Sequence, residues 1–192
     1  MITVPLQVWE LMLEQFAREK RRVEQVCYLD GVATGGGGVV TTLTFPNAVL
    51  TAGWFEVSPG AMSQAGKHMR AHGLRRLAQV HTHPSDWVGH SPWDDQHAYS
   101  HRIGALSIVL PRYGRNSPSL AQVGIHIRTA DGWQQIELAF VDKYIRIVPS
   151  CCDFRAPFEE VQHDRSRIEP TRRKPWGALR AFFRLSERRD HG

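Results

Sequence analysis

The sequence has few cysteines, and this excludes two classes of small protein. It also has no repeated segment. It contains three cysteines in 192 residues, and two of them, Cys151 and Cys152, are adjacent. An odd number with an adjacent pair does not make a disulfide framework, which favours a reducing compartment. No cysteine is paired with a histidine at the spacing of a zinc ribbon. A small disulfide-rich scaffold and a cysteine-based zinc finger are therefore excluded.

The sequence also lacks a long hydrophobic run. No apolar stretch approaches the roughly 20 residues that a membrane-spanning helix requires. The first residues, MITVPLQVWELMLEQF, carry no early positive charge and no small-residue cleavage site, so they do not have the pattern of a signal peptide. We therefore expect a soluble cytoplasmic protein that does not associate with a membrane.

Charge is unevenly distributed along the chain. The net charge is +5, and residues 154–192 contain ten Lys or Arg against six Asp or Glu. These positive charges are scattered, with few interleaved aromatics, so nucleic acid is an unlikely partner. We expect one domain over residues 1–150 and a basic, Pro- and Arg-rich extension over 151–192, with a short amphipathic helix at 178–185.

Hydrophobic spacing predicts an α/β fold. Helices are expected over residues 5–20, from Ser58 to Gly73, and from Ser91 to about Arg102. Strands are expected over residues 23–29, 39–45, 74–81, 106–110, 123–128 and 133–139, with a last strand or short helix over 140–148. The four glycines at 35–38 indicate a flexible hairpin connection, or alternatively a flap over a substrate groove. This order of elements predicts a three-layer-like sandwich in which helices flank a mixed, curved sheet.

One stretch has the spacing of a metal site. Residues 80–100 contain His81, His83, Ser91 and Asp94 in the pattern H-x-H-P-x(6)-S-x(2)-D. Side chains alternate across a strand, so two histidines one residue apart at a strand end point the same way. A carboxylate that returns after a loop completes a set of three nitrogen and oxygen ligands. This is the ligand mix of a catalytic zinc site that keeps its fourth position open.

Other residues in the same stretch compete for the role of ligand. Asp95 is adjacent to Asp94, and Asp86 is a weaker rival. Three further histidines are candidates on residue type alone: His90, His97 and His101. We interpret His97 and His101 as sharing one helix face, either exposed or behind the site. Asp94 is preferred because it alone fits the spacing.

At these residues the chain resembles the JAMM family of metalloproteases, also called JAB or MPN-plus. The family motif adds an upstream glutamate in stretches similar to E-x-x-G-L-L-x-G, and here EQVCYLDG places Glu24 and Gly31 at that spacing. Cys27 stands where the family often has glycine. The resemblance extends over roughly residues 5–148, and it implies a JAB1/MPN-type fold related to cytidine deaminases.

The resemblance also implies a role for each residue. His81, His83 and Asp94 would hold Zn²⁺, which lowers the pKa of a bound water from about 15.7 to around 7. Glu24 would act as general base and then as general acid. Ser91 would donate a hydrogen bond to the oxyanion of the tetrahedral intermediate. If Glu24 does not fill its role, Asp30 is the next carboxylate to consider.

The activity that the resemblance implies is hydrolysis after the C-terminal glycine of a ubiquitin-like protein. The chain looks most like bacterial JAB proteins that occur beside ubiquitin-like conjugation enzymes, some of which serve antiviral defence. The expected partners are a ubiquitin-like protein or its conjugates and the E1/E2-like enzymes of the same pathway. A folded substrate would dock on nearby apolar surface. The candidate docking residues are Trp54, Phe55, Trp87 and Trp93.

Two alternatives remain open from the sequence. The first is a peptidase of the same type that acts on a sulfur-carrier protein or a short peptide, and it would share every catalytic residue. The second is a non-catalytic scaffold of the same fold that uses its basic extension to bind a partner. Loss of a ligand would mark such a scaffold, and no ligand is lost in this sequence.

Overall fold

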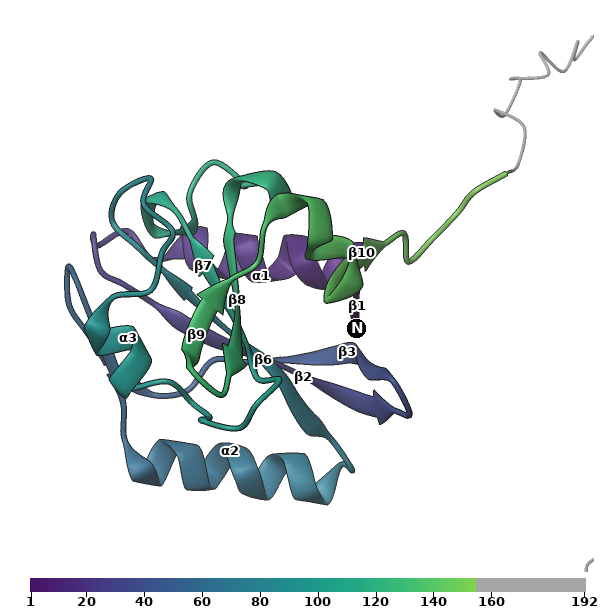
Figure 1. The fold of residues 1–192 in the computed structure, drawn as a ribbon, viewed down its shortest axis with the longest axis horizontal. Coiled ribbons are helices and arrows are strands. Elements are labelled where there is room, and N and C mark those ends of the chain that lie inside the picture. The colour runs from purple at the N-terminus through teal and green to yellow at the C-terminus, as the bar shows by residue number, and fades with distance from the viewer. Residues whose placement is uncertain (155–192) are drawn as a thin grey trace, which may run out of the picture. The chain divides into compact units, whose positions relative to one another are not determined.

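The computed structural model describes residues 1–154 and has the predicted α/β architecture, a mixed eight-stranded sheet with helices packed against it (Figure 1). The strand order is β10-β1-β3-β2-β6-β7-β8-β9. Strand β1 pairs in parallel with both β10 and β3, and β6 pairs in parallel with β7, whereas the other pairs are antiparallel. Strands β4 and β5, which follow β3 in the sequence, form a separate two-stranded sheet.

The element bounds follow the predicted order closely. The main sheet consists of β1 (Ile2–Pro5), β2 (Val26–Thr34), β3 (Gly37–Thr44), β6 (Arg75–Thr82), β7 (Leu106–Leu110), β8 (Gly124–Thr129), β9 (Gly132–Gln135) and β10 (Ile145–Val148). The small sheet consists of β4 (Ala48–Leu50) and β5 (Phe55–Val57). The α-helices are α1 (Leu6–Arg18), α2 (Pro59–Ala71) and α3 (Pro92–Gln96), and 3₁₀ turns are found at Arg112–Gly114, Leu120–Gln122 and Leu138–Lys143. None of these helices is long and apolar enough to cross a membrane.

Strand β2 separates two hydrophobic clusters. Because side chains alternate across a strand, Cys27 and Leu29 face the larger cluster, whereas Val26 and Tyr28 face the smaller one. The larger cluster contains the buried face of α1, which is made of Trp9, Met12, Leu13 and Phe16. The smaller cluster includes Met62 of α2. Helices α1 and α2 therefore cover opposite faces of the sheet, which is the layered arrangement that the sequence predicts (Figure 1).

The first four structured residues differ from the prediction. The expected helix begins at Pro5, but Ile2–Pro5 form strand β1 and the helix starts at Leu6. Ile2 and Val4 are buried between β10 and β3. Their burial comes from strand partners that lie far away in the sequence, and a run this short carries no periodic signal of its own.

Helix α2 begins as predicted, whereas α3 is much shorter than predicted. The Ser58 hydroxyl accepts a hydrogen bond from the amide of Ala61 at 3.2 Å, which caps α2. Helix α3 ends at Gln96, although a helix to about Arg102 was expected. The amide of Tyr99 donates instead to the side chain of Gln79 on β6 at 3.2 Å. Contact with the sheet therefore ends α3 after little more than one turn.

The remaining differences concern element boundaries. The strand expected over 23–29 begins at Val26 and continues to Thr34, which leaves Glu24 outside it. Residues 138–148 form a 3₁₀ turn and then β10, so both alternatives for that stretch occur in sequence. The glycine run connects β2 to β3 as a hairpin. The amphipathic helix at 178–185 lies outside the described residues, and the division at residue 150 stays a prediction.

A buried ion pair stabilises the centre of the sheet. Asp30 is fully buried on β2 and contacts Arg76 on β6, with 3.0 Å between Oδ1 and Nε. The Thr44 hydroxyl donates to Asp30 Oδ2 at 2.7 Å, and the Arg76 guanidinium lies 3.5 Å from the centroid of the Tyr28 ring. Strand β2 changes register against both neighbours beside Asp30, so this pair sits at the irregular point of the sheet.

We expect Asp30→Ala to lower the free energy of unfolding by about 3–5 kcal/mol, because it leaves the charge of Arg76 buried without its partner. Chemical denaturation followed by circular dichroism measures this change. Asp86→Ala is the matched control, because Asp86 pairs with Arg112 on the surface. A similar loss of stability in both variants would contradict the role given to burial.

Candidate metal centre

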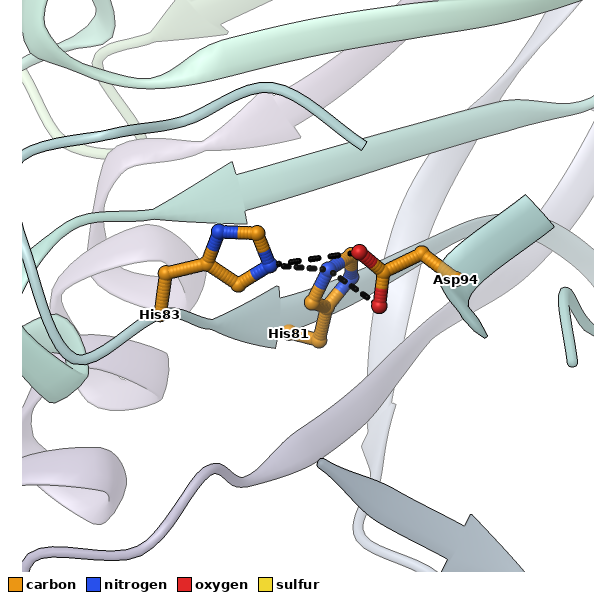
Figure 2. Close-up of side chains that lie close together, drawn as sticks. All are labelled: His81, His83 and Asp94. Atoms are coloured by element: carbon orange, nitrogen blue, oxygen red, sulfur yellow. Dashed lines mark hydrogen bonds and ion pairs between the residues drawn. The ribbon is translucent and has the colours of Figure 1, made fainter. Parts of the chain in front are cut away.

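The C-terminal end of β6 presents two imidazoles on one face. His81 and His83 are two residues apart, and both are buried. Their Nε2 atoms lie 3.3 Å apart, and both point toward the carboxylate of Asp94 (Figure 2). The distance from His81 Nε2 to Asp94 Oδ1 is 3.4 Å, and that from His83 Nε2 to Oδ2 is 3.3 Å. The structure thus brings together the three residues predicted as ligands.

The start of helix α3 places Asp94. Ser91 is the N-cap, and its hydroxyl accepts a hydrogen bond from the Asp94 amide at 3.2 Å. In return, the Ser91 amide and hydroxyl both donate to Asp94 Oδ2 at 2.7 Å. This reciprocal capping box uses the local spacing S-x-x-D. Ser91 therefore holds the Asp94 carboxylate in place, and its predicted role as oxyanion donor stays a prediction.

Backbone contacts hold the segment that carries His83. The His83 amide donates to the carbonyl of Leu110 at 2.8 Å, and the amide of Tyr113 donates to the His83 carbonyl at 2.7 Å. Arg112 and Tyr113 have φ angles of 51° and 59°, in the left-handed region that costs energy for residues other than glycine. This strained turn is held against the ligand segment.

The ring of His83 has a defined orientation. Its Nδ1 donates to the carbonyl of Trp87 at 3.1 Å, which leaves the lone pair on Nε2 when the imidazole is neutral. The Trp87 indole stacks on the same ring, with 5.1 Å between centroids and 20° between planes. The Nδ1 atom of His81 is buried and has no hydrogen-bond partner within residues 1–154.

Two of the three side chains, His81 and Asp94, already have the protonation state of a metal ligand. Burial opposes ionisation of Asp94, but hydrogen bonds with His81 and His83 hold its pKa well below its usual range. Burial lowers the pKa of His81, so this imidazole is neutral at pH 7. Burial also acts to lower the pKa of His83, but the hydrogen bond to Asp94 and the negative charges of Glu24 and Asp94 together outweigh it and raise the pKa, so His83 would release a proton when it binds a metal. An ionised carboxylate and a neutral imidazole are the forms that bind a metal.

The distances fit a tetrahedral metal ion. In a tetrahedral site with metal–nitrogen bonds of about 2.0–2.1 Å, ligand atoms are about 3.3–3.4 Å apart. The two histidine Nε2 atoms are 3.3 Å apart, and each lies 3.3–3.4 Å from one oxygen of Asp94, His81 from Oδ1 and His83 from Oδ2. Three Lewis bases converge, so a cation or a shared proton is required between them. The residues present fit a divalent metal ion.

Glu24 lies beside this centre in the segment that precedes β2. The Glu24 amide donates to the carbonyl of Thr51 at 2.7 Å, and the next amide, that of Gln25, donates to the Thr82 hydroxyl at 3.0 Å. These bonds tie the segment to the β4–β5 loop and to the end of β6. Glu24 is 3% exposed, and burial raises its pKa to about 7. Its carboxyl group can therefore both accept and release a proton near neutral pH.

The rival residues are not part of the ligand set. Asp95 pairs with His90, with 3.0 Å between Oδ1 and Nδ1, and Asp86 is an exposed partner of Arg112. Asp30 belongs to the buried ion pair at the centre of the sheet. The prediction that His97 and His101 share a helix face is wrong, because α3 ends before them, whereas their exposure agrees with the first of the two alternatives.

A buried aromatic cluster behind the metal centre was not predicted. His90 Nε2 contacts the hydroxyl of Ser107 at 2.9 Å, and the His90 ring stacks on that of His126 at 4.1 Å. The His90 ring also lies 5.7 Å from that of His81. Both ring nitrogens of His126 and the indole nitrogen of Trp133 are buried without a partner within residues 1–154. A single histidine on a distant strand gives no sequence signal for such a cluster.

Comparison with known proteins finds a probable metalloprotease among the proteins that this chain is similar to. No protein-family model matches the sequence. A stretch of 76 residues, 39% of this chain, is 36% identical to the probable metalloprotease y4jG of Sinorhizobium fredii. The chain is similar to a metalloprotease. It spans about half of that relative, since the match covers 46% of its length.

Solved structures support the fold. The solution structure of a protein from Desulfitobacterium hafniense aligns with a TM-score of 0.59 at 23% identity, and covers 78% of this chain and 94% of that one. A JAB1/MPN domain protein from Archaeoglobus fulgidus aligns with a TM-score of 0.43 at 20% identity, over 71% and 94% of the two chains. The first alignment shows a shared fold, and the second is too weak to add to it.

Proposed function

We propose that this chain is a zinc-dependent peptidase of the JAMM type. The observation that carries the proposal is the convergence of His81, His83 and Asp94, with the buried carboxyl of Glu24 beside them. Zinc bound by these residues would act as a Lewis acid that polarises a carbonyl group and makes water more acidic. The sequence similarity to a probable metalloprotease supports the same class of reaction.

In the proposed hydrolysis, Glu24 and Ser91 have different roles. Glu24 takes a proton from the attacking water and delivers it to the leaving amine, a role that suits a buried carboxyl whose pKa is raised by burial in the metal-free site. Ser91 keeps the Asp94 carboxylate oriented. When substrate is bound, we assign the single O–H of Ser91 to the developing oxyanion instead of Asp94 Oδ2, a contribution of about 3–4 kcal/mol in comparable sites, while the Ser91 amide keeps its hydrogen bond to the carboxylate.

The substrate that we propose is a ubiquitin-like protein, cleaved after its C-terminal glycine. Three tryptophans support docking of a folded protein, because Trp54, Trp87 and Trp93 are 36%, 55% and 38% exposed. Trp54 and Trp93 contact each other, with 5.4 Å between ring centroids. Exposed tryptophans of this kind are frequent anchors of protein interfaces. Phe55, the fourth predicted docking residue, is buried against His81 and is not available.

The pathway we propose is bacterial ubiquitin-like conjugation in antiviral defence, with E1/E2-like enzymes as partners. This part of the proposal rests on the order of elements in the compact catalytic domain, which looks most like that branch of the family. Cys27 is a free thiol, as are Cys151 and Cys152 within residues 1–154, which supports a reducing, cytoplasmic location.

We expect protein purified without added metal to contain about one equivalent of zinc per chain, because the three ligands and their orientation are already in place. Elemental analysis measures the content. A fusion in which a ubiquitin-like domain ends in Gly-Gly before a reporter should be cleaved after the second glycine, and chelation should abolish cleavage until zinc is restored.

Two controls make this result specific. A sulfur-carrier protein with the same Gly-Gly end and a short Gly-Gly peptide should be cleaved more slowly, because the first presents different surface side chains and the second has no folded surface to dock. Zinc below about a tenth of an equivalent, with no recovery on adding zinc, would contradict the catalytic proposal. Faster cleavage of the sulfur-carrier fusion would keep the chemistry and overturn the substrate.

A further inference from the structure

A groove of about 970 Å³ lies away from the metal centre, between α2, the first residues of β6 and the 99–105 loop. Residues that line it include Met62, Met69, Arg70, Arg75, Arg102 and Ile103. The walls come from segments that the proposed chemistry does not use. The groove therefore requires an explanation of its own.

The groove is positively charged and has no acidic wall. Arg70, Arg75 and Arg102 are exposed, and no ion pair within residues 1–154 involves them. Arg76 also lines the groove but is neutralised by the buried Asp30. The two segments that build the walls contain no Asp or Glu at all, since residues 57–85 and 96–130 lack both. Among the described residues, these three arginines are therefore exposed without an acidic partner.

The lining combines these charges with aliphatic surface. Ile103 is 74% exposed, and the methionines of α2 contribute further apolar area. Arginine presents a planar fork that binds a carboxylate through two parallel hydrogen bonds, which favours acidic side chains as ligands. A ligand that fits both features carries carboxylates and aliphatic groups together.

We propose that this groove binds an acidic, partly aliphatic segment of a partner protein. The chain's own extension is a poor occupant, because residues 154–192 have the same sign of charge, with ten Lys or Arg against six Asp or Glu. Single-stranded nucleic acid is disfavoured as well, because it needs aromatic platforms for its bases. Tyr99 is the aromatic residue of the lining, and it packs against Tyr28.

The groove and the metal centre occupy opposite ends of one strand. Arg76 lies near the start of β6 and His81 near its end. Five residues of strand separate them by about 17 Å, at a rise of roughly 3.3 Å per residue. A segment bound in the groove would leave the metal centre free. The inference therefore stands independently of the proposed peptidase activity.

The test measures binding by the fluorescence anisotropy of a labelled ten-residue peptide of Asp, Glu and Leu. The comparison peptide has Asn and Gln in place of the acids. We expect the acidic peptide to bind the full chain at least about tenfold more tightly than the neutral one. The variant Arg70→Glu, Arg75→Glu, Arg102→Glu should weaken that binding by at least about tenfold, because it reverses the charges that face the ligand.

A charge-matched variant distinguishes binding in the groove from nonspecific attraction of the acidic peptide to a positively charged protein. Arg18→Glu, Arg22→Glu, Arg146→Glu changes the net charge equally at exposed positions outside the groove, and it should retain binding within about threefold at 0.15 M salt, where distant charges are screened. Thermal melting of both variants checks that they fold. Equal loss of binding in the two variants would overturn the proposal. Preferential binding of a labelled oligothymidine, lost in the groove variant, would overturn it in favour of nucleic acid.

Discussion

Glu24→Gln is expected to reduce kcat by about 10²–10⁴-fold while the protein keeps its zinc and its fold. The substitution preserves the size of the side chain and removes its ability to transfer a proton, a role that contributes this much in general acid–base catalysis. Glu24 is outside the group of converging ligand atoms, so the metal should remain bound. The backbone amide of residue 24 would still donate to the Thr51 carbonyl, so the β4–β5 loop should not move.

The measurement combines steady-state hydrolysis of the Gly-Gly fusion with elemental analysis of the same preparation. Glu56→Gln is the control, because Glu56 is an exposed glutamate on the neighbouring strand β5. We expect that variant to have full activity. If Glu24→Gln lost zinc, Glu24 would be a ligand and not a base. If Glu24→Gln kept its activity, another group would transfer the proton. That group would not be Asp30, the alternative suggested by the sequence, because its carboxylate is bound to Arg76 and Thr44.

Asp94→Asn is expected to lower zinc affinity by more than about 100-fold and to abolish hydrolysis. Loss of a residue that only hydrogen-bonds to a metal ligand costs about 10–100-fold in metal affinity, and here a negatively charged ligand itself is replaced. The asparagine side chain also has one acceptor oxygen where Asp94 has two, and the oxygen that accepts from Ser91 is not the one nearest His81. We therefore expect Asp94→Asn to disrupt the whole metal site.

The neighbouring aspartate provides an unusually close control. Asp95→Asn makes the same chemical change one residue away, at a side chain that contacts His90 instead of the metal centre. We expect it to retain zinc and most of its activity, as measured by competition with a chromogenic chelator and by the reporter assay. The opposite pattern, with zinc retained in Asp94→Asn and lost in Asp95→Asn, would show that the carboxylate ligand has been assigned to the wrong residue.

Much of the metal centre could be predicted because its rules are local. His81 and His83 share a face because strand geometry alternates with a period of two residues. Ser91 and Asp94 meet because a capping box requires this spacing at the start of a helix.

Other features were decided by contacts between residues far apart in the chain. Glu24 is buried because its segment bonds to Thr51 and Thr82, and its raised pKa follows from that burial. The end of α3 depends on the reach of Tyr99 to Gln79. The groove joins α2 to a loop some thirty residues later. Spacing along the sequence predicts which side chains share an element, whereas burial, which sets their pKa values and their partners, depends on how the elements pack.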